Sequence, residues 1–343
     1  PLEQPQEGKA SLGDLSVGLD ARGGLTPQAV RTAALVGSWI VAAGGALVSA
    51  GVVLLALTAW RTFAIATRRD ATAWSFPLAV SWLVAAVLLG VFLAIQRRWP
   101  VLPISPLSLL RAHAHIGLAG FFLTLLQGAT FQLMPMFTMA ELQRPAFVTA
   151  GIVGTQAGLP LLAIGWIAGM QGLTHLGAFV VLAGIACSAI PLSATLRVRR
   201  RRKLEPGVRA FLAGATLLFA AAILGTCLLF MAEPPAAAAF AYGMLAIVGG
   251  LGLCVPGMLC KIVPFLVWMR TYGPMVGRQS VPAATKLASP VLEYTWLALH
   301  LAALPPLMHG ALATNPHTLA AGVWLLGAAI VAFLANMMKI LAH

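Results

Sequence analysis

The chain has 343 residues, of which 60% are hydrophobic and only 9% are charged, with a formal net charge of +13. Its mean hydropathy is +0.91. This composition excludes a soluble globular enzyme, a disordered chain and a collagen-like fibre, because one soluble core cannot bury so much apolar surface. The apolar runs are continuous and about twenty residues long, which indicates membrane-spanning helices and not the alternating strands of a membrane barrel.

The predicted fold is therefore all-α, a polytopic transmembrane helix bundle with about nine spans. Residues 1–31 are polar and glycine-rich and are expected to form an N-terminal tail or loop, and 32–343 are expected to form a single transmembrane domain. In chain order the predicted spans are 32–60, 74–96, 112–137, 147–170, 174–196, 208–231, 237–262, 287–309 and 316–341. Two alternatives stay open: either these nine spans are complete, or three more precede them to make twelve.

Basic residues predict the orientation of the bundle, because cytoplasmic loops of membrane proteins are rich in Lys and Arg. The loop after the fifth span contains seven of them between Arg197 and Arg209. Alternating the spans from that loop puts sixteen basic residues on its side and six on the other. The N-terminus is thus predicted outside and the C-terminus in the cytoplasm. The positive charge is explained by topology, so no nucleic-acid partner is expected.

Six of the seven histidines fall towards the outer face in this topology, namely His113, His115, His175, His300, His309 and His317. Neutral imidazole is a common metal ligand, and ionisable groups inside spans often mark functional sites. His175, His309 and His317 are therefore candidate metal ligands. The alternative for these three is that they are ordinary interfacial residues beside water.

The third span contains a stripe of small and polar residues at helical spacing. His113, Gly117, Gly120, Thr124 and Gln127 share one helix face, where small residues allow close approach of a neighbour. The stripe predicts either helix packing or the wall of a cavity. His115 lies about 200° round the helix from His113, so the two serve different centres unless the helix begins irregularly.

The eighth span carries a possible route for protons. Glu293 lies about 10 Å along the helix from His300, with Tyr294 beside it, and Lys261 of the seventh span is expected at a similar depth. Intramembrane Glu and Lys residues either line a water path or form a structural ion pair, and both alternatives stay open. The proline pair Pro305–Pro306 is expected to end this span.

Two segments resemble known bacterial membrane proteins. The runs AHAHIGLAGFFLTLLQGATFQLMPMF and GMLCKIVPFLVWMRTYGP resemble the NnrS-like and haem–copper-oxidase-subunit-I-like families. The resemblance implies a multi-pass protein of the bacterial inner membrane that binds haem b, and also copper, near the outer face. It differs at Ile116, where the NnrS-like pattern has an acidic residue, and it lacks the paired histidines that bind copper in the oxidases.

From this resemblance, His113 or His115 together with His300 are the expected axial ligands of the haem. The expected function is electron transfer or the handling of nitric oxide or oxygen, with or without catalysis. The expected partners are the lipid bilayer and a cytochrome or other respiratory subunit. Two other functions stay open: a transporter for copper or a small molecule, and a non-catalytic assembly or anchoring subunit of a respiratory complex.

Overall fold

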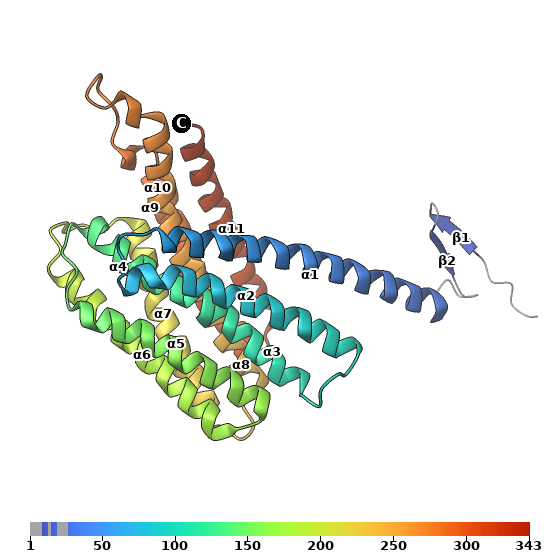
Figure 1. The fold of residues 1–343 in the computed structure, drawn as a ribbon. Helices are drawn as coiled ribbons and strands as arrows, with labels where there is room; N and C mark the ends of the chain where they lie inside the picture. Colours follow the sequence, from blue (N-terminus) through green and yellow to red (C-terminus); the bar gives the residue numbers. More distant parts are fainter. Residues whose placement is uncertain (1–8, 13–14, 19–26) are drawn as a thin grey trace, which may run out of the picture.

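The structure is a computed structural model that describes residues 9–12, 15–18 and 27–343, with side chains from Trp39 onward apart from Arg98. Within these residues the chain is almost entirely helical, which confirms the predicted all-α fold (Figure 1). A small antiparallel hairpin of β1 (Lys9–Leu12) and β2 (Leu15–Gly18) precedes the helices. Most of the predicted tail, 1–31, lies outside the described residues.

The first part of the bundle contains seven helical segments. They are α1 (Pro27–Ala64), α2 (Ala71–Arg98), α3 (Pro106–His115), the π-helix η1 (Ile116–Leu123), α4 (Thr124–Thr138), α5 (Pro145–Ala168) and α6 (Gln171–Arg197). Segments α3, η1 and α4 follow one another without a break and make one long span. Asp70 caps the start of α2 by accepting the backbone N–H of Ala73, and proline begins both α3 and α5.

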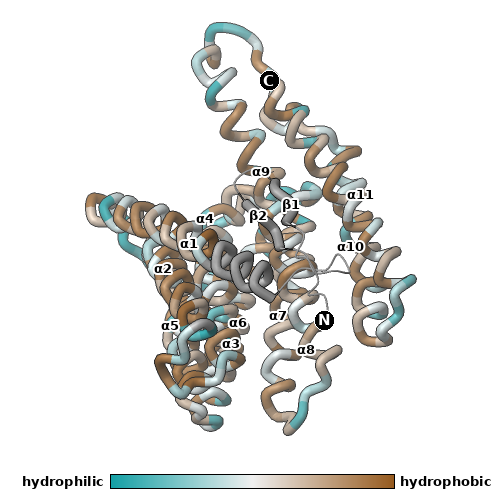
Figure 2. Tube along the Cα trace, turned by 90° about the vertical axis from the view of Figure 1, so that its right-hand side faces the viewer, coloured by the Kyte–Doolittle hydropathy of each residue, from teal (hydrophilic) through white to brown (hydrophobic). Residues whose placement is uncertain are grey.

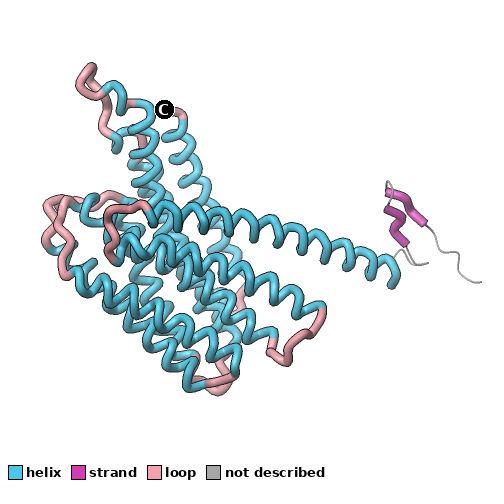
Figure 3. Tube along the Cα trace, viewed as in Figure 1, coloured by secondary structure: helices cyan, strands magenta, loops and turns pink. Residues whose placement is uncertain are grey.

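The second part contains the remaining helices. They are α7 (Pro206–Leu228), α8 (Ala236–Met244), the π-helix η2 (Leu245–Leu251), α9 (Gly252–Thr271), the short 3₁₀ turns η3 (Gly273–Met275) and η4 (Ala284–Lys286), α10 (Pro290–Leu312) and α11 (Pro316–Leu341). Segments α8, η2 and α9 again form one span. Figure 3 shows that loops make up little of the chain apart from the connection between α9 and α10.

Eight helices in the described part of the chain are long and apolar enough to cross a membrane. The predicted span 287–309 forms α10 but is not among them. It is less apolar than the others because it carries Glu293, His300 and His309. Hydrophobic residues predominate along the helices (Figure 2). Many large apolar side chains are exposed, as expected where helices contact lipid.

Helix contacts divide the bundle into pairs. Helix α5 packs along α6, α10 along α11, α7 along α9, and α1 against α2. A buried cluster joins the two parts of the bundle, because Met134 of α4 packs with Phe211 of α7 and Met258 of α9. Helix α1 extends beyond the other helices towards the hairpin (Figure 1).

The prediction that the eighth span ends at Pro305–Pro306 is wrong, because α10 continues to Leu312. Proline removes backbone hydrogen bonds, but packing against a neighbour compensates for this inside membranes. Helix α11 provides that packing: a Cβ on Gly310 would lie 2.6 Å from Leu319 N, and one on Gly322 would lie 2.8 Å from Leu307 N. His300 therefore lies about 18 Å along the helix from its last residue.

Candidate functional site

A cavity of about 850 Å³ lies among α3, η1, α5, α6, α7 and α8, with a few lining residues from η2. Most of its lining is apolar. Its polar side chains come from four helices and are Ser108, Arg111, His115, Gln171, Thr174, His175, Thr226 and Tyr242. A volume of about 300–1,000 Å³ with few polar groups is typical of sites for small molecules and cofactors.

His115 is the last residue of α3 and is held at both ring nitrogens. Its Nδ1 lies 2.8 Å from the carbonyl oxygen of Arg111, which can only accept, so Nδ1 carries the proton. The Nε2 of a neutral ring is then an acceptor. The hydroxyl of Tyr242 donates to it across 3.0 Å. The backbone thus fixes the tautomer that leaves the Nε2 lone pair on the side of Tyr242.

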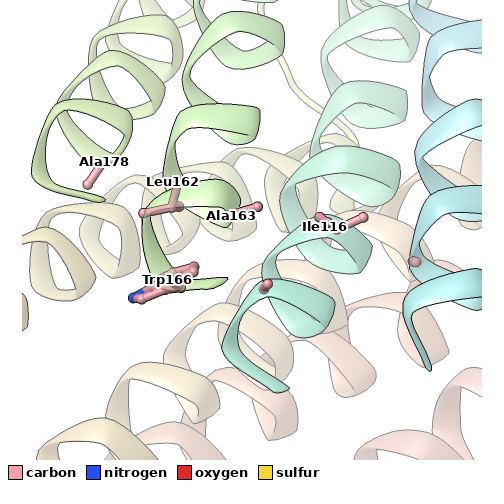
Figure 4. Close-up of a cluster of buried hydrophobic side chains, with 7 residues drawn as sticks. Ile116, Leu162, Ala163, Trp166 and Ala178 are labelled. Atoms are coloured by element: carbon pink, nitrogen blue, oxygen red, sulfur yellow. The ribbon is translucent and has the colours of Figure 1, made fainter. Parts of the chain in front are cut away.

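Aromatic rings enclose this imidazole. The Trp166 ring of α5 lies 4.5 Å from the His115 ring, and the Tyr242 ring of α8 lies nearly parallel to it at 5.9 Å. Figure 4 shows Trp166, Leu162 and Ala178 in the apolar cluster that also contains Ile116. Trp166, Leu162 and Ala178 line the cavity as well, so this cluster forms one of its walls.

Both residues of the His115–Tyr242 pair stand just before a π-helix. Segment η1 begins at Ile116, and η2 begins at Leu245, three residues after Tyr242. Single π-turns within α-helices occur frequently at functional sites, because the extra residue per turn changes the direction of nearby side chains. Gly225 of α7 leaves the space for the phenol, since a Cβ there would lie 2.7 Å from Tyr242 Cε2.

His113 faces away from this cavity. Its Nδ1 lies 2.9 Å from the carbonyl oxygen of Ala86, and a Cβ on Gly90 would lie 2.9 Å from its Cε1. Its ring therefore packs against α2. The separation of His113 and His115 follows from the helix geometry, since residues two apart point in different directions.

His300 also lies outside the cavity lining. Its Nε2 donates to the carbonyl oxygen of Val248 in η2 across 2.9 Å, and its ring packs beside Gly252 and edge-on to Trp296. Of the three histidines expected to bind haem, His115 lines the cavity. His113 and His300 each bind a backbone carbonyl of another helix instead.

The candidate metal ligands are spread over different helices. His175 lines the cavity, stacks on Phe230 and binds the carbonyl oxygen of Leu229 through Nε2 at 3.1 Å. His309 Nδ1 lies 3.3 Å from Thr318 Oγ1, and the exposed His317 is the second residue of α11. Within the described residues, no group of three or more His, Cys, Asp or Glu side chains could hold a metal ion.

The predicted stripe of the third span packs mainly against neighbouring helices. A Cβ on Gly120 would lie 2.8 Å from the Trp82 side chain of α2, whereas Gly117 faces open space. Thr124 accepts a hydrogen bond from Gln156 of α5 at 2.8 Å. Gln127 donates to both Thr155 and Ser188, and so links α4 to α5 and α6.

A second polar region surrounds Lys261. Its ammonium pairs with Glu205, which also pairs with Arg201. It does not pair with Glu293, although a structural Glu293–Lys261 ion pair was one of the two alternatives expected from the sequence. Glu293 is buried beside Asn336. Tyr294 is exposed and lies under the guanidinium of Arg209, 5.9 Å from its ring centre.

Sequence reasoning missed three residues of these sites: Glu205, Trp166 and Tyr242. Glu205 did carry a signal, since it is the single acidic residue between Glu141 and Glu233 and stands among basic residues. Trp166 and Tyr242 resemble ordinary aromatic residues of a span, and only the packing of α3, α5 and α8 brings them to His115.

No protein-family model matches this sequence, and no curated protein is significantly similar to it. The chain is a polytopic helical membrane protein, and eight helices in its described part are long and apolar enough to cross a membrane. The half-buried imidazole of His115, between a tryptophan and a tyrosine, lines a large cavity in the described part of the chain.

Proposed function

We propose that this membrane protein binds one b-type haem in the cavity, with His115 as an axial ligand. The observation that carries the proposal is the fixed tautomer of His115: Nδ1–H is bound to the Arg111 carbonyl, and Nε2 is an acceptor at the cavity. Histidine ligands of metals characteristically donate their second ring N–H to a carbonyl or carboxylate, which orients the ring.

The dimensions and chemistry of the cavity support a flat, mainly apolar ligand. The volume of about 850 Å³ is within the range for cofactor sites, and the wall around Trp166 is apolar. Arg111 also lines the cavity and supplies a guanidinium that can pair with a propionate carboxylate. A charged donor of this kind suits a ligand that is apolar over most of its surface and anionic at one edge.

Each nearby residue has a distinct role in this proposal. The Arg111 carbonyl orients His115, and Trp166 holds the imidazole plane. The Tyr242 hydroxyl now bonded to Nε2 is displaced on ligation and stays in the cavity as a hydrogen-bond donor. His175 lines the same cavity and keeps its ring against Phe230. When bound, the haem supplies one-electron transfer and a site for a diatomic gas, with electrons exchanged with a respiratory partner.

The test is the absorption spectrum of the purified protein together with its haem content. We expect a Soret band in the wild-type protein, and a fall in haem content of more than about tenfold in His115→Ala, because the axial bond is lost. His300→Ala and His113→Ala are the matched controls, since their rings bind backbone carbonyls outside the cavity lining. They should keep the spectrum.

Two results would overturn the proposal. One is a wild-type protein, produced in cells that make haem, that contains none. The other is haem retained in full by His115→Ala and lost in His300→Ala, which would place the cofactor elsewhere. Tyr242→Phe should keep the haem, because the phenol is not a ligand in this arrangement.

A further inference from the structure

Glu205 is the centre of an ion-pair triad. It immediately precedes α7 and uses both carboxylate oxygens: Oε1 accepts from Arg201 and Oε2 accepts from Lys261 of α9. The Lys261 side chain is only 12% exposed, so this pair is largely shielded from water. The triad contains two cations and one anion, and therefore carries one net positive charge.

Glu293 lies in the first turn of α10 and is only 9% exposed. One turn further along α10, Leu297 belongs to the same buried cluster as Cys260, the residue before Lys261. None of the ion pairs found among the described residues includes it. The groups that act on its carboxyl are Lys261 and Glu205 of the triad, and Asn336 of α11. Cys260 of α9 also interacts with it electrostatically. Arg209 of α7 faces the neighbouring Tyr294, and Lys339 is exposed on α11.

Asn336 is fixed in place beside Glu293. It is 1% exposed, and its Oδ1 accepts the backbone N–H of Ser289 across 2.8 Å. With the amide oxygen committed to the backbone, the NH₂ group is what remains for other partners. The groups that act on the Glu293 carboxyl therefore include one neutral amide and two charged members of the triad.

Two opposing effects act on the charge of Glu293. Removal from water penalises the carboxylate, and a charge without an ion-pair partner is costly in a buried place. The net positive charge of the triad and the N-terminus of α10 both favour the carboxylate. These effects compete at one side chain, and Lys261 is the cation among the groups that act on it.

We propose that Glu293 is a proton-binding site whose occupancy depends on whether Lys261 pairs with Glu205 or with Glu293. When Lys261 pairs with Glu205, Glu293 takes a proton from water and is neutral. When Lys261 turns to Glu293, the carboxyl releases that proton to water and the Glu205–Arg201 pair remains. The loop that contains Arg201 is exposed next to the triad and connects it with solvent.

The test is an infrared titration of the protein as purified, and its readout is a carboxyl band, so that it is independent of the function proposed above. The carbonyl band of the protonated Glu293 is identified by its loss in Glu293→Gln. We expect this band to grow as the pH falls through the neutral range. The exposed Glu233 provides a matched control, since it follows the end of α7 opposite to Glu205, and Glu233→Gln should leave the band unchanged.

Two variants of the triad should move the titration midpoint in opposite directions. Glu205→Gln frees Lys261 for Glu293 and removes a nearby negative charge, so the midpoint should fall by at least about one pH unit, a tenfold change in proton affinity. Lys261→Met removes the nearby positive charge, so the midpoint should rise. Both variants keep the helices that pack around Glu293.

The proposal is overturned if no carbonyl band depends on Glu293 between about pH 5 and pH 9. It is also overturned if Glu205→Gln and Lys261→Met leave the midpoint where it is in the wild-type protein. If one of the two variants does not fold, the direction of the shift in the other is sufficient for the decision.

Discussion

Four histidines use one ring nitrogen to bind a backbone carbonyl. The acceptors are Ala86 for His113, Arg111 for His115, Leu229 for His175 and Val248 for His300. Backbone carbonyls need partners in a membrane, and three of these imidazoles supply donors to another segment, whereas His115 binds its own helix. At His113 and His300 the ring also fills the space beside a glycine of the neighbouring helix. His115 differs because its second nitrogen binds a side chain in the cavity.

A prediction at the residue scale concerns His300. Replacing it by Leu keeps an apolar side chain of similar length but leaves the Val248 carbonyl without this donor. Such a loss costs about 1–3 kcal/mol. We expect a lower apparent melting temperature in detergent together with an unchanged haem content. Unchanged stability would show that the hydrogen bond contributes little.

Gln127 gives a second prediction at this scale. Its Nε2 donates to Thr155 and Ser188 at 3.1 and 2.9 Å, and these hydroxyls donate in turn to backbone carbonyls. Gln127→Leu therefore removes the donor from which the two hydroxyls accept. Each hydroxyl still has a backbone carbonyl to which it donates its proton. We expect a modest destabilisation of about 1 kcal/mol, as for other polar contacts between membrane helices. Unfolding in mixed micelles measures it, and a loss several times larger would contradict this view.

At the scale of elements, the α5–α6 pair depends on glycine. Gly158 of α5 and Gly177 of α6 lie against the partner backbone, so that a Cβ would come within 2.6 Å of Val181 N and 2.3 Å of Leu162 N respectively. Small residues let two helices approach closely, which is the main source of packing energy in lipid. These glycines explain why α5 and α6 form such an extended contact.

The corresponding prediction compares two glycines of α6. Gly177→Ala forces the helices apart, because the atoms it meets belong to the Leu162 backbone. Overpacking of this kind costs about 1–3 kcal/mol. Gly172→Ala is the control, since its Cβ would meet nothing within 4 Å, and there Ala should be neutral or stabilising. Thermal unfolding in detergent separates the two, and equal effects would refute the packing argument.

At the scale of the whole molecule, the orientation in the membrane stays a prediction from charge. The exposed Lys203 belongs to the loop before α7, and the exposed Ala313 belongs to the turn between α10 and α11. We expect a membrane-impermeant maleimide to label Ala313→Cys in intact cells, and Lys203→Cys only after permeabilisation. The exposed Cys227 is first replaced by Ser. The reverse labelling pattern would invert the topology.

The sequence by itself determined the membrane class, the all-α fold and the approximate position of most spans. Long apolar runs leave the chain few alternatives in lipid, where every backbone group must be satisfied within a helix. The same reasoning found His115 and Glu293 as unusual residues inside the bundle. The prediction that the eighth span ends at Pro305–Pro306 was wrong, because the packing of α11 against α10 outweighs the local effect of two prolines.

Tertiary structure alone decided which polar residues meet. His113 and His115 are two residues apart, yet the rotation of the helix sends one to α2 and the other to the cavity. Lys261 pairs with Glu205, more than fifty positions away, and not with Glu293. Such pairings depend on the depth and rotation of separate helices. Hydropathy and spacing along one span do not contain that information, because it arises only when the helices pack.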